Sequence, residues 1–146
     1  MDRIDLWSSG GGTQSTAIAV LILQGKLPKP DLAVIADTER EKQTTWDYAA
    51  QYTIPALASI GVKLDRISKD NFNAPDLIAK NGRDFLMPLY TRQNGTLSKM
   101  PTLCSNEWKQ RPIRRFATNL FPNRSFRVWL GISSDESKRI KQGSPA

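Results

Sequence analysis

A glycine triplet at residues 10–12 constrains the fold of this chain more than any other feature. It separates a short strand-like run at residues 4–7 from a helical pattern that starts at Thr13 and stops at Gly25. Glycine lets a ligand approach the backbone closely, and the unpaired N–H groups and positive dipole of a helix start attract anions. These residues therefore predict either an anion-binding turn or a tight turn capped by its own Ser and Thr side chains.

A second unit of strand, helix and strand follows the first. Residues 32–36 form a continuous apolar run, which is typical of a parallel strand buried on both faces. Residues 41–60 predict a helix that Pro55 should kink or interrupt, and residues 62–67 alternate like a strand. Successive units of this kind predict an α/β fold, a three-layer, mostly parallel Rossmann-like sheet with helices on both faces. The expected inward side of the long helix is Trp46, Ala49, Ala50, Ile54, Leu57 and Ile60.

The remaining segments complete a single domain over residues 1–146. Breaks at Pro and Asn-Gly predict a helix followed by an irregular insertion or flap over residues 71–102. Residues 106–119 look helical around a proline, and residues 126–130 predict a fourth strand. The polar residues after that strand favour the start of a helix, and residues 143–146 are expected to fray.

The composition rules out several kinds of site. The chain has no histidine, which removes the commonest metal ligand and the commonest general base. Its single cysteine, Cys104, cannot form an intrachain disulfide or a Cys-rich metal site, and we expect it to be a small buried hydrophobe. We find neither a run of about 18 apolar residues nor a signal-peptide start, so we expect a soluble, cytoplasmic protein without membrane contact.

An excess of basic residues favours anionic partners. The 21 Lys and Arg residues outnumber the 14 Asp and Glu residues and give a net charge of +7. This charge suits nucleic acid, nucleotides, sulfate or phosphate esters and does not choose among them. The densest basic cluster is either a site for such an anion or a solvated helix face paired with Glu107, and Trp108 beside it could stack on a base. This cluster is Lys109, Arg111, Arg114 and Arg115.

Two well-known phosphate loops do not fit the glycine triplet. A Walker A loop needs a Lys at the helix start, which is absent here, and a dinucleotide-binding G-x-G-x-x-G needs glycine where Ser15 stands. The segment instead resembles the PP-loop signature S-G-G-x-D-S, with Gly10 at the first Ser unless Ser9 supplies that hydroxyl. The phosphate-binding residues that this resemblance implies are Ser9, Gly10, Gly11, Gly12, Thr13, Gln14, Ser15 and Thr16.

Three later segments resemble the phosphoadenosine phosphosulfate (PAPS) reductase branch of the PP-loop superfamily. Asp37 and Thr38 match the acidic-Thr pair at the end of the second strand. Residues 104–113 are similar to C-x4-K-x2-P-[LI], with Lys109 at the lysine. Residues 131–139 resemble G-I-R-x-x-E-S-x-R. Four matches in the same order along the chain are far more specific than one.

The resemblance implies an adenine nucleotide alpha hydrolase-like fold that binds ATP or a related adenine nucleotide such as PAPS. The nucleotide would lie across the carboxyl ends of the strands, which agrees with the general placement of ligands on open parallel sheets. Asp37 and Thr38 would contact the adenosine, and Gly131 and Ile132 would contact the same ligand. Further candidate contacts, to a substrate, are Lys109, Arg111, Arg114, Arg115 and Arg139.

The sequence departs from this family's pattern at three places. Gln14 replaces the acidic residue of the loop, and an amide cannot hold Mg²⁺ through charge, so the case for Mg²⁺ is weak and no metal ligand is assigned. Ser133 stands where the family has an arginine. The family's nucleophilic cysteine lies in a Glu-Cys-Gly-Leu-His segment that this sequence lacks, so we expect no reductase activity.

Three functions stay open at this point. The first is adenine-nucleotide binding, with nucleotidyl transfer or cleavage between the α and β phosphates as the reaction if the chain is catalytic. The second is a non-catalytic or partial domain that needs a partner to complete its site. The third is nucleic-acid binding through the basic cluster. A homodimer that forms through an exposed sheet edge is compatible with each of them.

Overall fold

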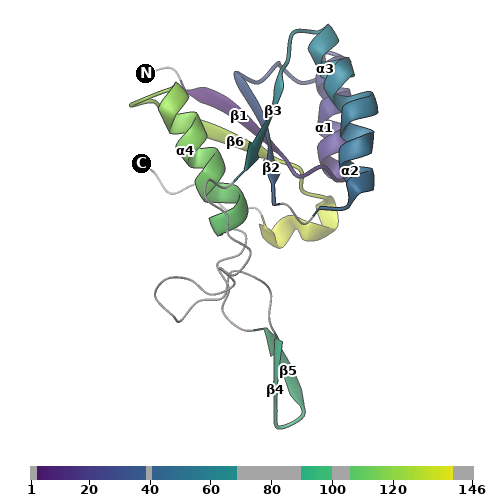
Figure 1. The fold of residues 1–146 in the computed structure, drawn as a ribbon, viewed down its shortest axis with the longest axis vertical. Coiled ribbons are helices and arrows are strands. Elements are labelled where there is room, and N and C mark those ends of the chain that lie inside the picture. Colours follow the sequence, from purple (N-terminus) through teal and green to yellow (C-terminus); the bar gives the residue numbers. More distant parts are fainter. Residues whose placement is uncertain (1–2, 39–40, 69–89, 100–105, 140–146) are drawn as a thin grey trace.

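A four-stranded parallel sheet forms the centre of the structure (Figure 1). Its spatial order is β3-β2-β1-β6, and each strand runs parallel to its neighbours. The predicted α/β class and parallel sheet are therefore confirmed. The strands are β1 (Ile4–Ser9), β2 (Leu32–Asp37), β3 (Leu64–Ser68) and β6 (Phe126–Leu130). The computed structural model describes residues 3–38, 41–68, 90–99 and 106–139.

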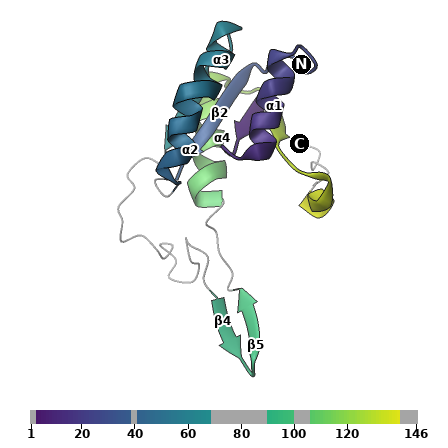
Figure 2. The ribbon, with the colours of Figure 1, turned by 90° about the vertical axis from the view of Figure 1, so that its right-hand side faces the viewer.

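Helices join these strands and cover both faces of the sheet (Figures 1 and 2). The segment between β1 and β2 is α1 (Thr13–Leu23). The segment between β2 and β3 is one long helical run made of α2 (Gln43–Tyr48), the π-helix η1 (Ala49–Thr53) and α3 (Ile54–Ser59). The last helices are the π-helix η2 (Asn106–Gln110) and α4 (Arg111–Leu120) before β6, and the 3₁₀ helix η3 (Ser134–Arg139) after it.

The core consists of two apolar clusters, one on each face of the sheet. On one face, α1 and the run from α2 to α3 pack over Trp7 of β1, and Leu57 of α3 is buried in the same cluster; both side chains are fully buried. On the other face, α4 packs through Ile113 and Ala117 against Val34 of β2. Helices on both faces follow from the chain itself, because β2 is apolar at five of its six positions and has to be covered twice.

Each proline-containing helix carries a π-helical stretch before its proline. Pro55 and Pro112 occupy the second position of α3 and α4, directly after the five-residue stretches η1 and η2. Proline lacks an N–H group and its ring crowds the carbonyl four residues back, so a wider turn relieves the clash. The effect at Pro55 is therefore a local change of helix type within a continuous helical run.

The wider turn also changes which side chains face inward. Ala49 and Leu57 are buried as expected, but Ala50 is exposed and Ile54 keeps 37% of its surface exposed. The prediction was wrong at these two positions because it assumed a period of 3.6 residues along the whole run, whereas η1 has the wider turn of a π-helix. Leu57, which follows η1, is still fully buried.

Residues 90–99 form a regular hairpin, so the expectation of an irregular segment was wrong there. The strands β4 (Tyr90–Gln93) and β5 (Thr96–Lys99) pair antiparallel across Asn94 and Gly95. These two residues have φ of 48° and 80°, as a two-residue hairpin turn with two positive φ angles requires. The Asn-Gly pair was the available signal for this hairpin. The helix expected from residue 71 falls outside the described residues.

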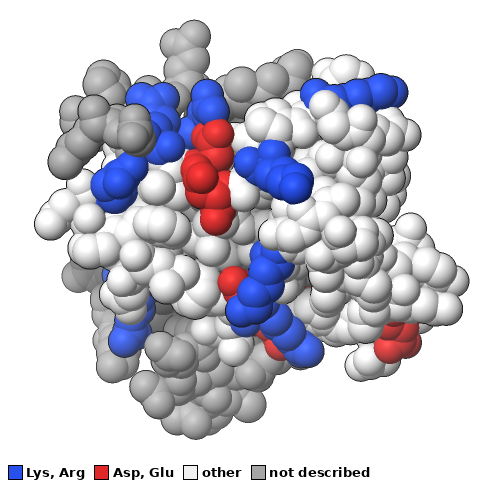
Figure 3. Space-filling model, turned by 90° about the horizontal axis from the view of Figure 1, so that it is seen from above, with Lys and Arg blue, Asp and Glu red and all other residues white. Residues whose placement is uncertain are grey.

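Charged contacts fasten the amino ends of the strands, on the side seen in Figure 3. Arg127 of β6 donates two hydrogen bonds of 2.5 Å to the carboxylate of Asp5 in β1. The Asp31 carboxylate, just before β2, accepts the backbone N–H of Asp5 at 2.8 Å. The start of β1 is therefore joined to the starts of both neighbouring strands.

This contact predicts a loss of stability in acid. The hydrogen bonds from Arg127 hold the pKa of the Asp5 carboxyl below its usual value of about 3.9, so the folded chain binds fewer protons there than the unfolded chain. The stabilisation is complete above that usual value and disappears as the pH falls through the lowered pKa of the folded state. Urea unfolding midpoints from neutral to acid pH measure it. Asp5→Asn should flatten the acid limb, and an unchanged limb would contradict the assignment.

Candidate functional site

The predicted binding residues converge at the carboxyl ends of the strands. The glycine loop of residues 10–12 follows β1, Asp37 and Thr38 end β2, and Gly131 follows β6. The chain moves from β1 to β2 and β3 on one side, whereas β6 lies on the other side of β1. The reversal of strand order therefore falls between β1 and β6, which is where ligands bind open parallel sheets.

Gly11 is the position in the loop that requires glycine. Its φ is +70°, and a Cβ placed there would lie 2.9 Å from the Cγ2 of Thr45 and 3.5 Å from the Cδ1 of Ile35. The loop is therefore packed against both α2 and β2. Any side chain at Gly11 would combine backbone strain with a steric clash.

Two serines accept hydrogen bonds from amides of the glycine loop. The N–H of Gly10 donates to the Oγ of Ser15 at 2.8 Å, and the N–H of Gly11 donates to the Oγ of Ser9 at 3.2 Å. Both serine residues are buried. Of the two outcomes open from the sequence, the turn held by its own hydroxyl groups is present at these two amides.

The backbone amides at the start of α1 differ from those of Gly10 and Gly11. Its N-cap residue is Gly12, which has no side chain to accept a hydrogen bond, and no side-chain cap is formed. The first N–H groups of a helix have no partner within the helix, and they concentrate the positive end of its dipole. The first turn of α1 is thus an uncapped group of donors beside the point where the strand order reverses.

Gly131 brings the end of β6 against this same turn. A Cβ at Gly131 would lie 2.9 Å from the carbonyl carbon of Gln14 and 3.0 Å from the backbone nitrogen of Ser15. Such distances allow no side chain without a backbone shift. Gly131 therefore lies against the loop residues with which it was grouped from the sequence.

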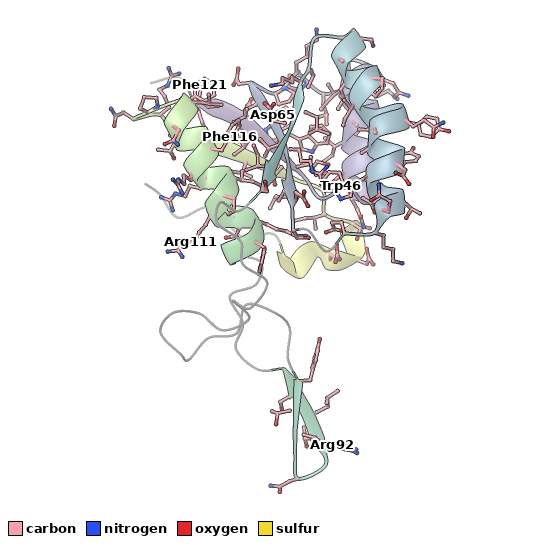
Figure 4. All side chains as sticks on the ribbon, in the orientation of Figure 1. Trp46, Asp65, Arg92, Arg111, Phe116 and Phe121 are labelled. Carbon is pink, nitrogen blue, oxygen red and sulfur yellow. The ribbon has the colours of Figure 1, made fainter. Side chains whose placement is uncertain are left out.

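Asp37 pairs with an arginine that the sequence analysis missed. Arg66 of β3 donates from Nε to the Oδ2 of Asp37 at 2.8 Å, and its Nη2 bonds the same oxygen. The Arg66 guanidinium also lies over the ring of Trp46 in α2, 4.0 Å from its centroid. Trp46 is labelled in Figure 4. Arg66 shares the strand parity of the buried Val62 and Leu64, and a cation on that side of the strand was the signal for a carboxylate partner.

Replacing Arg66 tests how this pair holds the edge of the sheet. Arg66→Ala removes two charge-assisted hydrogen bonds from a carboxylate whose side chain is only 9% exposed. Because Arg66 itself is largely exposed, the expected loss is about 1 kcal/mol of unfolding free energy. Arg66→Lys should recover only part of it, since lysine offers neither the planar fork nor the stack on Trp46. Urea unfolding measures both variants, and full recovery by lysine would contradict the geometry.

The basic cluster is divided by the fold. Lys109 of η2 lies 3.7 Å from the Oε1 of Glu41, which follows Asp37 and Thr38 in the chain, so Lys109 reaches the carboxyl edge. Arg111 begins α4 near that edge (Figure 4). The remaining two arginines lie exposed further along α4, on the face of the sheet opposite α1; they are Arg114 and Arg115.

Trp108 does not offer an open stacking surface. It is 5% exposed, so the expectation that it could stack on a base was wrong. The π-helical turn at η2 places it among buried residues at the base of α4. A large aromatic residue can be buried even where its neighbours in sequence are exposed basic residues.

Ser133 caps the helix after β6. It stands where the resembled family has an arginine, and its carbonyl accepts the N–H of Glu136 at 3.0 Å while its Oγ lies 3.4 Å from the Oε2 of Glu136. The hydroxyl of Ser133 also lowers the pKa of Asp135. These contacts give Ser133 a structural role as the start of η3. The side chain of Arg139 lies outside the described residues.

A narrow crevice separates the loop from α2 and η1. Its volume is about 10 Å³, which is room for roughly one water molecule. A phosphate group would therefore lie over its mouth, not inside it. Six of its ten lining residues carry a hydroxyl group, namely Ser9, Ser15, Thr16, Thr45, Tyr48 and Thr53.

The structure also bears on metal binding, membrane spanning and dimerisation. Among residues 3–38, 41–68, 90–99 and 106–139, no three acidic or cysteine side chains gather where they could hold a metal ion. In the same part of the chain no helix has the length and apolar character to cross a membrane. β6 is an edge of the central sheet, with Val128 and Leu130 more than half exposed, and dimerisation through it stays a prediction.

Comparison of the chain with known protein families, with curated proteins and with solved structures found no match in any of the three.

Proposed function

We propose that this chain binds an adenine nucleotide, ATP or a related compound such as PAPS, across the carboxyl edge of its parallel sheet. The observation that carries the proposal is the uncapped first turn of α1, which lies where the strand order reverses between β1 and β6. The first N–H groups of a helix have no partner within the helix, and Gly12 offers no side chain to cap them, so these groups and the positive helix end favour a phosphate there. The proposal includes the finer fold type, a Rossmann-like sheet of the adenine nucleotide alpha hydrolase kind.

The surrounding residues support a ligand longer than a single phosphate. Asp37 and Thr38 end the strand next to the loop, and Gly131 with Ile132 follows the strand on the other side. In the proposed complex the phosphates lie at the start of α1 and the adenosine extends toward Asp37. Lys109 approaches the same edge from η2, where it pairs with Glu41.

Binding without turnover is the alternative that a specific observation favours. The amides of Gly10 and Gly11 are bonded to serine hydroxyls, and Gln14 offers no charge for Mg²⁺. If the chain is catalytic, the reaction we propose is nucleotidyl transfer or cleavage between the α and β phosphates, with the amides of the first turn of α1 stabilising the transferred phosphate. A non-catalytic domain that a partner completes would bind the same ligand and release it unchanged.

Thermal unfolding with a panel of ATP, AMP, adenosine phosphosulfate and PAPS tests the binding. A ligand at 100 times its Kd stabilises a folded protein by about 2.7 kcal/mol, so at least one member should raise the melting temperature by several degrees. Incubation with ATP and Mg²⁺ followed by detection of AMP and pyrophosphate separates turnover from binding. An unchanged melting temperature with every ligand would overturn the proposal.

A further inference from the structure

The β4–β5 hairpin has two faces of different chemistry. Cross-strand partners in an antiparallel pair share a face, and successive residues alternate between faces. The register pairs Tyr90 with Lys99 and Arg92 with Leu97, so these four positions form one face, the mixed face. The other face carries only uncharged polar residues, which are Thr91, Gln93, Thr96 and Ser98.

The mixed face lies open to solvent. Tyr90 is 62% exposed and Leu97 is 69% exposed, the largest exposures among the big apolar side chains of the described residues. Arg92 is also exposed, and Figure 4 shows it at the side of the hairpin. A two-stranded hairpin is only marginally stable in water, so this face is suited to be covered by a partner.

The charge around the hairpin is of one sign. Between Asp84 and Glu107 the sequence contains Arg92 and Lys99 and no acidic residue. With a net charge of +7 over the whole chain, an anionic partner is electrostatically favoured at this face.

We propose that the mixed face binds single-stranded nucleic acid. Tyr90 offers an open ring on which a base can stack, and Arg92, about 6.8 Å further along the same strand, offers a guanidinium to the phosphate backbone. An acidic peptide would engage the cations and leave the ring unused. In a duplex the bases are stacked on one another and are closed to Tyr90. This site is separate from the proposed nucleotide site and does not depend on it.

Fluorescence anisotropy of the full chain with short labelled oligo(U) and oligo(dT) tests the proposal at low salt, and the two oligomers distinguish RNA from DNA. Tyr90→Ala should weaken binding about tenfold, since one base stack is worth that much or more. Tyr90→Phe should retain binding, because it keeps the ring. Arg92→Ala should lower the slope of log Kd against log salt by about 0.7. The matched controls, Thr91→Ala and Ser98→Ala on the polar face, should bind like the parent chain.

Several results would overturn the proposal. They are the absence of binding at low salt, equal binding by Tyr90→Ala and the parent, equal loss in the Thr91→Ala control, and equally tight binding of a duplex of the same sequence. Displacement of the oligomer by excess ATP would place it at the nucleotide site instead. Vesicles of anionic lipid serve as a further arm, and binding to them with the same losses in the variants would assign the face to a membrane.

Discussion

Replacing Gly12 with aspartate should abolish nucleotide binding and at the same time stabilise the chain without ligand. Gly12 has φ of −92° and ψ of −175°, an extended conformation that any residue adopts. A Cβ there meets only the Oε1 of Gln14 at 3.8 Å, so a side chain fits. An aspartate at this N-cap would bond the first-turn amides of α1 and interact with the helix dipole, which together with the lost flexibility of glycine adds about 1 kcal/mol.

The same carboxylate would occupy the position proposed for phosphate. Its charge would repel the ligand and its oxygens would take the donors that the ligand needs, so affinity should fall by more than about 100-fold, a difference of roughly 3 kcal/mol. Gly12→Asn is the matched control, because it has the same shape and cap without the charge. It should keep the cap but lose the interaction of the charge with the helix dipole, so it should be slightly less stable than Gly12→Asp and should bind the nucleotide more tightly. Melting temperatures with and without ATP give both quantities. Normal binding by the aspartate variant would remove the start of α1 from the nucleotide site.

The second large effect is expected at Gly131. Alanine there would place its Cβ 2.9 Å from two atoms of Gln14 and 3.0 Å from the nitrogen of Ser15, and backbone atoms cannot rotate away as a side chain can. We expect Gly131→Ala to lower the unfolding free energy by about 1–3 kcal/mol, the usual cost of overpacking. It should also weaken any ligand that depends on the first turn of α1.

Gly10→Ala is the control for this prediction. Its Cβ would lie 3.6 Å from the Oγ of Ser15, an ordinary contact, so its stability should stay near that of the parent. Both substitutions remove one glycine from the unfolded chain, so the difference between them isolates the steric clash. Guanidinium unfolding of the parent, Gly131→Ala and Gly10→Ala measures this difference in stability when the three denaturation slopes are equal. Equal stability of Gly131→Ala and Gly10→Ala would mean that the end of β6 moves freely away from α1.

Local pattern was enough to predict the elements of the central sheet. The apolar run of β2 and the glycine punctuation around α1 depend on neighbours in the chain, and burial on both faces selects apolar residues. The residues that face inward on the longer helices were harder to predict from the sequence. Pro55 was expected to interrupt its helix, but a sequence does not reveal whether the interruption is a kink, a break or a π turn, and each rotates the later residues differently.

The site residues show the same difference between features set by local pattern and features set by tertiary contacts. The loop, Asp37 and Gly131 were grouped from the sequence because strand ends of a parallel sheet meet at one edge. The roles of individual side chains depend on contacts between distant segments. Arg66 lies 29 residues from Asp37, and Trp108 is buried by tertiary packing that its basic neighbours do not indicate.

The two serine hydroxyls in the loop have a consequence for how a ligand would come and go. Because Ser9 and Ser15 bond the amides of Gly11 and Gly10, these groups are satisfied whether or not an anion is present. A phosphate that reaches them exchanges one set of partners for another, and the net gain per bond is about 0.5–1.5 kcal/mol at most. The loop would thus keep the same structure before a ligand binds and after it leaves. Binding and release would then require no folding or unfolding of the loop.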